Sequence, residues 1–315
     1  MIILRSAGAK SLILLTLILL ILSACGSTGS TGSGSPGVTP TQVTLKLGSK
    51  KDLEARILSE MFNLRLTKVG FNVQAVTPGV NSFVFNGIRS GDIDVYPEFT
   101  STGLSALHVT PTRDPQKDYQ TVKDGFEKQF QITWLSAAFG LNDTYAICAR
   151  KDRAQQLGVT TLSQLVPKLS QLTMALPPDS LYVLDFLKPV YGIQATSFKS
   201  LQKVDYSIGF QSVENGQADI NFCYSTDVTI AQKNLVVIQD DKMAFPPYNP
   251  APIVRDSVLQ ANPKIADALN PLATVLTNDV SLMLQKDALD KQNTGMTVEQ
   301  SIKATVTEFL QSKGL

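Results

Sequence analysis

Strand and helix patterns alternate after Val43, and this alternation constrains the fold more than any other feature of the chain. The segment VTLKLGS alternates apolar and polar residues as a strand does, and KKDLEARILSEMFNLRLTKVG then predicts a helix that ends at Gly70. FNVQAV is a second predicted strand, SFVFNGIRSG a short helix and DIDVY a third strand. Strands that alternate with helices indicate a parallel sheet covered by helices. The apolar face predicted for the first helix consists of Leu53, Ile57, Leu58, Met61 and Phe62.

A second set of strand patterns lies further along the chain. These segments are YAICARKD (145–152), LTMALP (172–177), ADINFCY (218–224) and LVVIQD (235–240). The tail from Pro263 to Leu315 carries apolar stripes at helical spacing. Roughly 275 residues follow position 40, which is enough for two lobes with separate cores. The sequence therefore predicts an α/β protein with two lobes.

The N-terminus has the pattern of an export signal. Arg5 and Lys10 precede a short apolar run, SLILLTLILLIL, and the sequence LSAC ends at Cys25. LSAC resembles the lipobox of bacterial lipoproteins, in which the cysteine is acylated, although an ordinary signal peptide remains an alternative. The following GSTGSTGSGSPG is typical of a flexible tether. We expect a signal peptide at 1–24, a tether at 25–40 and a lipid on Cys25 that holds the protein on the extracytoplasmic face of the cell membrane.

Charge and side-chain inventory exclude several function classes. The formal net charge is +1, so nothing predicts a nucleic-acid partner. His108 is the only histidine, which argues against a histidine-based catalytic triad or a multi-histidine metal site, and we expect no cofactor and no metal. After Cys25, only Cys148 and Cys223 remain. They either bridge adjacent strands or stay as buried free thiols, and free thiols are the favoured interpretation.

Tyrosines recur where strand patterns give way to polar turns. The chain has eight tyrosines, and five occupy such positions: Tyr96, Tyr145, Tyr182, Tyr224 and Tyr248. Any one of them can simply span the boundary between core and water. GDIDVY and ADINFCY nevertheless each deliver a tyrosine to the end of a strand, and ligands of open α/β sheets bind at strand ends. Two lobes that each supply tyrosines would form an aromatic cleft.

Several motifs, taken in order, resemble a known family. GSK, GDIDVYPEFT, NDTYAI, YSTD, FPPYNPAPIVR and MTVEQSIKATVTEFLQSKG are similar to the glycine betaine/carnitine/choline-binding proteins of ABC importers. The resemblance implies a type II periplasmic-binding-protein fold, in which two α/β lobes joined by two crossover strands close over a central cleft. It implies lobe I at 41–145 and 248–315, and lobe II at 146–247. It also implies a monomer that binds a small quaternary-ammonium ligand and delivers it to ABC permease subunits for osmoprotection.

The family holds a trimethylammonium group in a tyrosine cage, and the motifs carry that role to numbered positions here. The matching positions are Tyr96, Tyr145, Tyr224, Tyr248 and, with a weaker match, Tyr119. Aromatic faces suit such a cation because it has no N–H to donate. Two departures concern Phe99 and Ser101, where typical members have Tyr and Gly. A third is that no arginine lies between Arg153 and Arg255, where many relatives carry one.

The missing arginine leaves the partner of a ligand carboxylate open. Tyr182 occupies that neighbourhood, and the candidates to hold a carboxylate are Lys50, Ser101, Thr102, Asn142 and backbone N–H groups. Alternatively the ligand has no carboxylate, which favours choline. Rival interpretations are the same fold with ectoine, a proline-type zwitterion or a polyamine, an enzyme with a cleft cysteine, and a structural surface lipoprotein. We expect no catalytic residues, with Glu98 as a structural acid.

Overall fold

The protein is represented by a computed structural model, and the residues that it describes are 42–315. The predicted signal peptide (1–24), the tether (25–40) and Cys25 lie outside the described residues. Among residues 42–315, no helix combines the length and the apolar character needed to cross a membrane.

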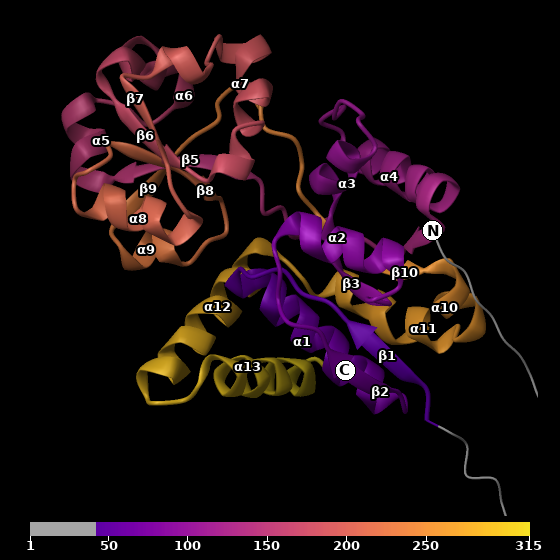
Figure 1. The fold of residues 1–315 in the computed structure, drawn as a ribbon. Coiled ribbons are helices and arrows are strands. Elements are labelled where there is room, and N and C mark those ends of the chain that lie inside the picture. The colour runs from indigo at the N-terminus through magenta and orange to yellow at the C-terminus, as the bar shows by residue number, and fades with distance from the viewer. Residues whose placement is uncertain (1–41) are drawn as a thin grey trace, which may run out of the picture. The chain divides into compact units, whose positions relative to one another are not determined.

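The first sheet of the described chain has the strand order β2-β1-β3-β10-β4 (Figure 1). Its strands are β1 (Thr44–Leu47), β2 (Asn72–Ala75), β3 (Val95–Phe99), β4 (Ile132–Trp134) and β10 (Pro250–Arg255). β1 pairs in parallel with β2 and with β3, as predicted, whereas β10 runs antiparallel to both of its neighbours. The sheet is mixed because a strand from the C-terminal part of the chain returns to it.

The second sheet has the order β7-β6-β8-β5-β9. Its strands are β5 (Tyr145–Arg150), β6 (Thr173–Leu176), β7 (Ser200–Lys203), β8 (Ile220–Tyr224) and β9 (Leu235–Ile238). Four of them were predicted, and β7 was missed. β7 reads Ser-Leu-Gln-Lys and lies exposed or half-buried at the sheet edge, so it lacks the apolar pattern of a buried strand.

Eight α-helices of the described chain precede β5 or follow β10 in the sequence. The helices are α1 (Leu53–Lys68), α2 (Asn81–Ser90), α3 (Thr100–Ala106), α4 (Pro115–Phe130), α10 (Asp256–Ala261), α11 (Lys264–Leu269), α12 (Asn278–Asn293) and α13 (Val298–Ser312), with a 3-10 helix at Asn270–Thr274. Asp52 caps α1 by accepting a hydrogen bond from the Ala55 N–H at 2.7 Å. Four of the five predicted core residues of α1 are buried, and Leu53 is half-buried.

Shorter helices surround the second sheet. They are α5 (Lys151–Leu157), α6 (Leu162–Leu165), α7 (Val183–Tyr191), α8 (Tyr206–Glu214) and α9 (Thr229–Gln232), with 3-10 helices at Val166–Gln171, Pro178–Ser180 and Ala195–Ser197. α8 packs on β5, β6 and β8, so it supports both the strand that begins at Tyr145 and the strand that ends at Tyr224.

Two crossover segments connect the sheets, one between β4 and β5 and one between β9 and β10. Hydrogen bonds join the two segments to each other. The Tyr248 N–H donates to Asn142 Oδ1 at 2.7 Å, and the Asp143 N–H donates to the Tyr248 carbonyl at 3.1 Å. Asn249 Nδ2 also donates to the Leu141 carbonyl at 2.7 Å. Tyr248 is therefore held at its backbone by the neighbouring crossover.

A disulfide joins Cys148 of β5 to Cys223 of β8, with 6.0 Å between their Cα atoms. The favoured expectation of free thiols is therefore wrong. In the antiparallel register, Cys148 lies opposite Asn221 and Cys223 opposite Ala146, so the two cysteines are diagonal neighbours on one face of the sheet. The sequence did not reveal this because strand pairing, rather than the separation of 75 residues, decides whether two cysteines meet.

Candidate ligand-binding site

Four tyrosine rings form one cluster, which we call the tyrosine cluster: Tyr145, Tyr182, Tyr224 and Tyr248. Tyr145 is central, with ring centroids 5.1 Å from Tyr248, 5.7 Å from Tyr224 and 6.1 Å from Tyr182. Tyr224 and Tyr248 are 5.8 Å apart. Tyr145 begins β5 and Tyr224 ends β8, and the antiparallel register places them directly opposite each other on one face. The sequence predicted a shared environment for five tyrosines, and these four of the five lie together.

Further rings, which sequence reasoning did not assign to the site, extend the tyrosine cluster. They are Phe186, Phe222 and Phe245 against Tyr145, Tyr206 against Tyr224, and Phe99 against Tyr248. Strand alternation could have identified Phe222, because it lies two residues before Tyr224 and so on the same face. Helical spacing could have identified Phe186, which follows Tyr182 by four residues. No comparable pattern marks Phe245.

Three of the four hydroxyl groups of the tyrosine cluster are hydrogen-bonded, namely those of Tyr145, Tyr182 and Tyr248. The Tyr145 and Tyr182 hydroxyls lie 3.0 Å apart, and the Tyr248 hydroxyl lies 2.6 Å from Thr102 Oγ1. Burial raises the pKa of Tyr145, Tyr224 and Tyr248 well above the ordinary tyrosine value. The phenols are therefore neutral at physiological pH, and they present uncharged aromatic faces.

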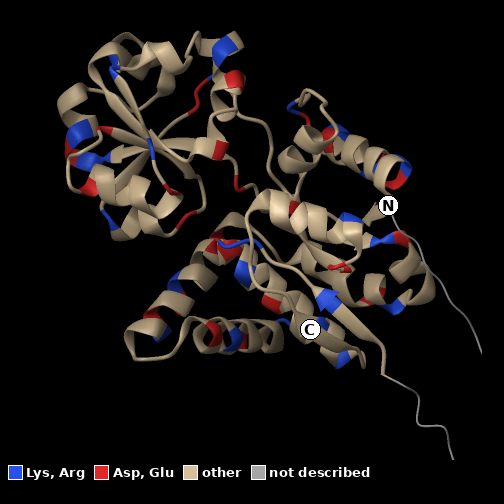
Figure 2. Ribbon diagram, viewed as in Figure 1, with Lys and Arg blue, Asp and Glu red and all other residues tan. Residues whose placement is uncertain are grey.

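Basic and acidic residues are interspersed along the helices of residues 42–315 (Figure 2). One buried ion pair lies directly beside the tyrosine cluster. Lys50 Nζ is 2.5 Å from Glu98 Oε1, and the two side chains are 6% and 1% exposed. Lys50 Nζ also lies 4.8 Å from the centroid of Phe99, whose ring stacks on Tyr248 at 4.7 Å. A protein cation is thus already placed against an aromatic face of the site.

Tyr96 lies on the other face of β3 from Phe99, because side chains alternate along a strand. Its ring is fully buried in a separate apolar cluster that includes Phe126 and Trp134. Its hydroxyl donates to Glu98 Oε2 at 2.7 Å. The structure therefore does not bring the Tyr96 ring into the tyrosine cluster, and it connects Tyr96 to Lys50 through Glu98.

The remaining predicted site residues occupy different surroundings. Tyr119 donates from its hydroxyl to the Leu135 carbonyl at 2.7 Å and packs on Phe139, apart from the tyrosine cluster. Ser101 is fully buried in α3, next to the half-buried Thr102 that reaches Tyr248. Asn142 uses its side-chain oxygen to hold the Tyr248 N–H. Asn142 thus helps to position Tyr248 through its backbone.

Two hollows flank the tyrosine cluster. The larger, about 470 Å³, is lined by Lys50, Tyr206 and Tyr224, among others. The smaller, about 250 Å³, is lined by Glu98, Thr102 and Tyr182, among others. Asn81 and Asp179 line both hollows. Volumes of this size suit a small solute.

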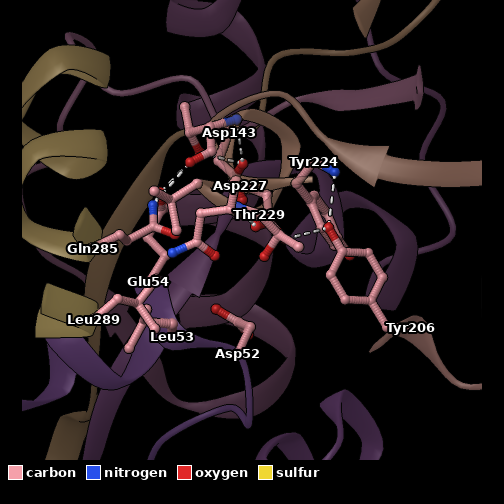
Figure 3. A pocket seen from close by; sticks show the side chains of 13 residues that line it. Asp52, Leu53, Glu54, Asp143, Tyr206, Tyr224, Asp227, Thr229, Gln285 and Leu289 are labelled. Atoms are coloured by element: carbon pink, nitrogen blue, oxygen red, sulfur yellow. Dashed lines mark hydrogen bonds between the residues drawn. The ribbon is translucent and has the colours of Figure 1, made fainter. Parts of the chain in front are cut away.

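A third hollow, about 240 Å³, lies beyond Tyr224 and is strongly acidic (Figure 3). Its acidic lining residues are Asp52, Glu54, Asp143 and Asp227. The Thr226 hydroxyl contacts Glu54 Oε2 at 2.8 Å and also contacts Asp143 Oδ1. Burial raises the pKa of Glu54 to about 7, and burial together with the Glu54 charge raises the pKa of Asp143. Sequence reasoning missed this group, because its members come from three separate segments of the chain.

Comparison with known proteins decides the family. Residues 43–312 match the model of the substrate binding domain of the ABC-type glycine betaine transport system. The chain belongs to this family. The resemblance seen in the sequence motifs is therefore confirmed over nearly the whole described chain.

This substrate-binding domain has curated relatives of similar length. It is 30% identical to the glycine-betaine-binding protein of Pseudomonas aeruginosa over 243 residues, and the aligned region covers 73% of this chain and 77% of that protein. It is 27% identical over 275 residues to the carnitine transport binding protein of Listeria monocytogenes, covering 85% and 86%. A solved structure of a glycine betaine/carnitine/choline ABC transporter has a TM-score of 0.67 at 24% identity, covering 86% of this chain and 98% of that one. This likeness confirms the bilobal fold class.

The chemistry open to this substrate-binding domain follows from the neutral rings. An aromatic face attracts a cation through its quadrupole and contacts methyl groups by dispersion. Rings fixed by hydroxyl partners present these faces without reorganisation. Within residues 42–315, no group of three or more His, Cys, Asp or Glu side chains is arranged to hold a metal ion. The tyrosine cluster is thus suited to recognise a soft organic cation.

Proposed function

We propose that this chain captures a quaternary-ammonium solute at the tyrosine cluster and delivers it to the permease of an ABC importer. The observation that carries the proposal is the convergence of Tyr145, Tyr182, Tyr224 and Tyr248. These rings come from β5, from the residue before α7, from β8 and from the second crossover segment. Relatives whose names specify glycine betaine and carnitine binding support the same solute class.

The energetics of aromatic recognition support this function. Each desolvated ring contributes roughly 0.5–2 kcal/mol to the binding of a cation. Four rings therefore supply a large share of the roughly 8 kcal/mol that micromolar affinity requires. Tyr96 and Lys50 contribute indirectly in this proposal, since both are bonded to Glu98 and Lys50 Nζ lies over the Phe99 ring.

The arrangement of the chain supports a closing movement. In our proposal, lobe I comprises 41–145 and 248–315, lobe II comprises 146–247, and the two crossover segments act as the hinge. Lobe closure would exclude water from the rings and strengthen their contact with the solute. The proposed role is capture and release by a monomer, without a catalytic step.

The N-terminal sequence supports a position at the membrane. Acylation of Cys25 and a flexible tether at 25–40 would keep the lobes close to the permease, outside the cytoplasm. A reservoir of solute-loaded protein at that place would serve uptake of compatible solutes for osmoprotection.

Isothermal titration calorimetry of the soluble body with choline, glycine betaine, carnitine and tetramethylammonium tests the proposal. At least one of these ligands should bind, and Tyr224→Ala should weaken its affinity at least tenfold. Tyr191→Ala is the matched control, because Tyr191 bonds to Asp240 and lies outside the tyrosine cluster. Binding should survive in that control within twofold. If none of the four ligands binds to the folded protein, the proposed function is wrong.

A further inference from the structure

The charges around the two hollows beside the tyrosine cluster are not balanced. The acidic lining residues are Asp52, Glu98, Asp179 and Asp205, and the basic ones are Lys50 and Lys51. Lys50 is bonded to Glu98 at 2.5 Å, so its charge is already matched inside the protein. Lys51 is exposed and lines only the larger hollow. The remaining balance is acidic, which favours a ligand with net positive charge.

Asp179 holds a distinctive place in this arrangement. It lies in the 3-10 helix Pro178–Ser180, lines both hollows and is exposed within them. No salt bridge among residues 42–315 includes it. Burial raises the pKa of the nearby Tyr182 phenol, and the Asp179 charge adds to this rise. An unpaired carboxylate thus faces the space that the tyrosine cluster borders.

We propose that Asp179 makes the site selective for quaternary-ammonium alcohols without a carboxylate, and that it disfavours zwitterions such as glycine betaine. This inference rests on the proposed function and names the ligand class for the same site. The Asp179 carboxylate accepts a hydrogen bond from a ligand hydroxyl and attracts the cation. A ligand carboxylate at the same end meets a like charge. The buried Lys50 is already bonded to Glu98, and Lys51, which is exposed, lines the larger hollow and not the smaller one.

Choline and glycine betaine form a matched pair for the test. Both carry a trimethylammonium group, and they differ in whether the other end is a hydroxyl or a carboxylate. Calorimetric titration of the wild-type protein should give at least tenfold tighter binding of choline. Asp179→Asn should reduce this affinity ratio at least tenfold, since the amide keeps the size of the side chain and removes the charge.

Asp185→Asn is the control for general electrostatics. Asp185 is exposed on α7, lies six residues from Asp179 and lines neither hollow, so the affinity ratio should stay within twofold of wild type. Thermal denaturation of each variant verifies that the fold is retained.

The possible outcomes distinguish a failure of this inference from a failure of the proposed function. Tighter binding of glycine betaine than of choline overturns the inference and leaves the proposed function standing. An unchanged ratio in Asp179→Asn overturns the role of Asp179, as does an equal loss of selectivity in Asp185→Asn. Failure of choline, glycine betaine, carnitine and tetramethylammonium to bind overturns the proposed function and the inference together.

Discussion

The hydroxyl of Thr226 lies 2.8 Å from Glu54 Oε2, although 172 residues separate the two along the chain. The same hydroxyl contacts Asp143, and Ser281 also donates to Glu54 Oε2. A hydroxyl has only one hydrogen to donate, so it can satisfy both carboxylates only if one of them carries a proton. A shared proton therefore connects α1, the first crossover, the segment after β8, and α12.

This shared proton predicts a pH dependence of stability. The pKa of Glu54 is raised to about 7 in the folded protein from an ordinary value of 4.5, so the folded state binds more protons than the unfolded state between these values. The contribution of Glu54 to the free energy of unfolding is fully present below about pH 4.5 and is lost as the pH rises through about 7. The free energy of unfolding should fall by an amount on the order of 3 kcal/mol over this range. Urea unfolding of wild type and Glu54→Gln across this range measures it.

Glu54→Gln should flatten the decline in unfolding free energy with pH, since the amide does not titrate. Glu127→Gln, at an exposed position in α4, is the control and should keep the wild-type slope. An identical slope in wild type and Glu54→Gln would show that Glu54 does not hold the proton.

The disulfide predicts a loss of stability that leaves ligand binding intact. Cys148 and Cys223 lie on the opposite face of the second sheet from Tyr145 and Tyr224, because side chains alternate along β5 and β8. The double variant Cys148→Ala/Cys223→Ala should lose about 2–5 kcal/mol of unfolding free energy. Ligand affinity should change by less than threefold at a temperature where the variant stays folded. A tenfold loss of affinity there would contradict the separation of the two faces.

The buried ion pair predicts non-additive effects of substitution. Glu98→Gln should lower the unfolding free energy by about 3–5 kcal/mol, because it leaves the Lys50 ammonium buried without its partner. The double variant Lys50→Met/Glu98→Gln should be more stable than Glu98→Gln alone, since no unpaired charge remains. Denaturant unfolding of the four proteins in this cycle measures the coupling. Additive losses would contradict a direct interaction between the pair.

Two substitutions at Tyr248 distinguish the role of its ring in ligand binding from the role of its hydroxyl. Tyr248→Phe removes the contact with Thr102 and keeps the ring stacked on Phe99, so the expected loss of affinity is less than about tenfold. Tyr248→Ala also removes the ring and should cost more than Tyr248→Phe. Calorimetric titration of both variants checks the order, and equal losses would assign recognition to the hydroxyl.

The sequence predicted those parts of the fold that depend on local pattern. Strands β1, β5 and β8 and helix α1 carry regular apolar spacing, and the tyrosines of β5 and β8 lie in recognisable motifs. β7 was missed because an exposed edge strand needs no apolar residues. Pairing partners such as β10 with β3, and Cys148 with Cys223, depend on contacts between segments far apart in the chain, which a local pattern does not encode.

The candidate site shows the same division. Tyr145 and Tyr224 were assigned to the site by the family resemblance, and Tyr224 also by its strand end; the register places the two opposite each other. The strand period of two also explains why Phe99, and not Tyr96, meets Tyr248, since the residues at 96 and 99 point to opposite faces of β3. Asp179 escaped notice because a lone acidic residue in a Pro-rich turn has no pattern of its own.

The position of β10 late in the chain constrains the order in which the two sheets can form. In the described chain, β4 pairs only with β10, so β4 has no strand partner until residues 250–255 have emerged from the ribosome or the export channel. All strands of the second sheet come earlier in the chain, and that sheet can form while the first is still incomplete. During synthesis or export, the second sheet can thus be complete while the first sheet still lacks β10. Truncation before residue 250 removes β10 and leaves the edge of β3 open to unwanted pairing.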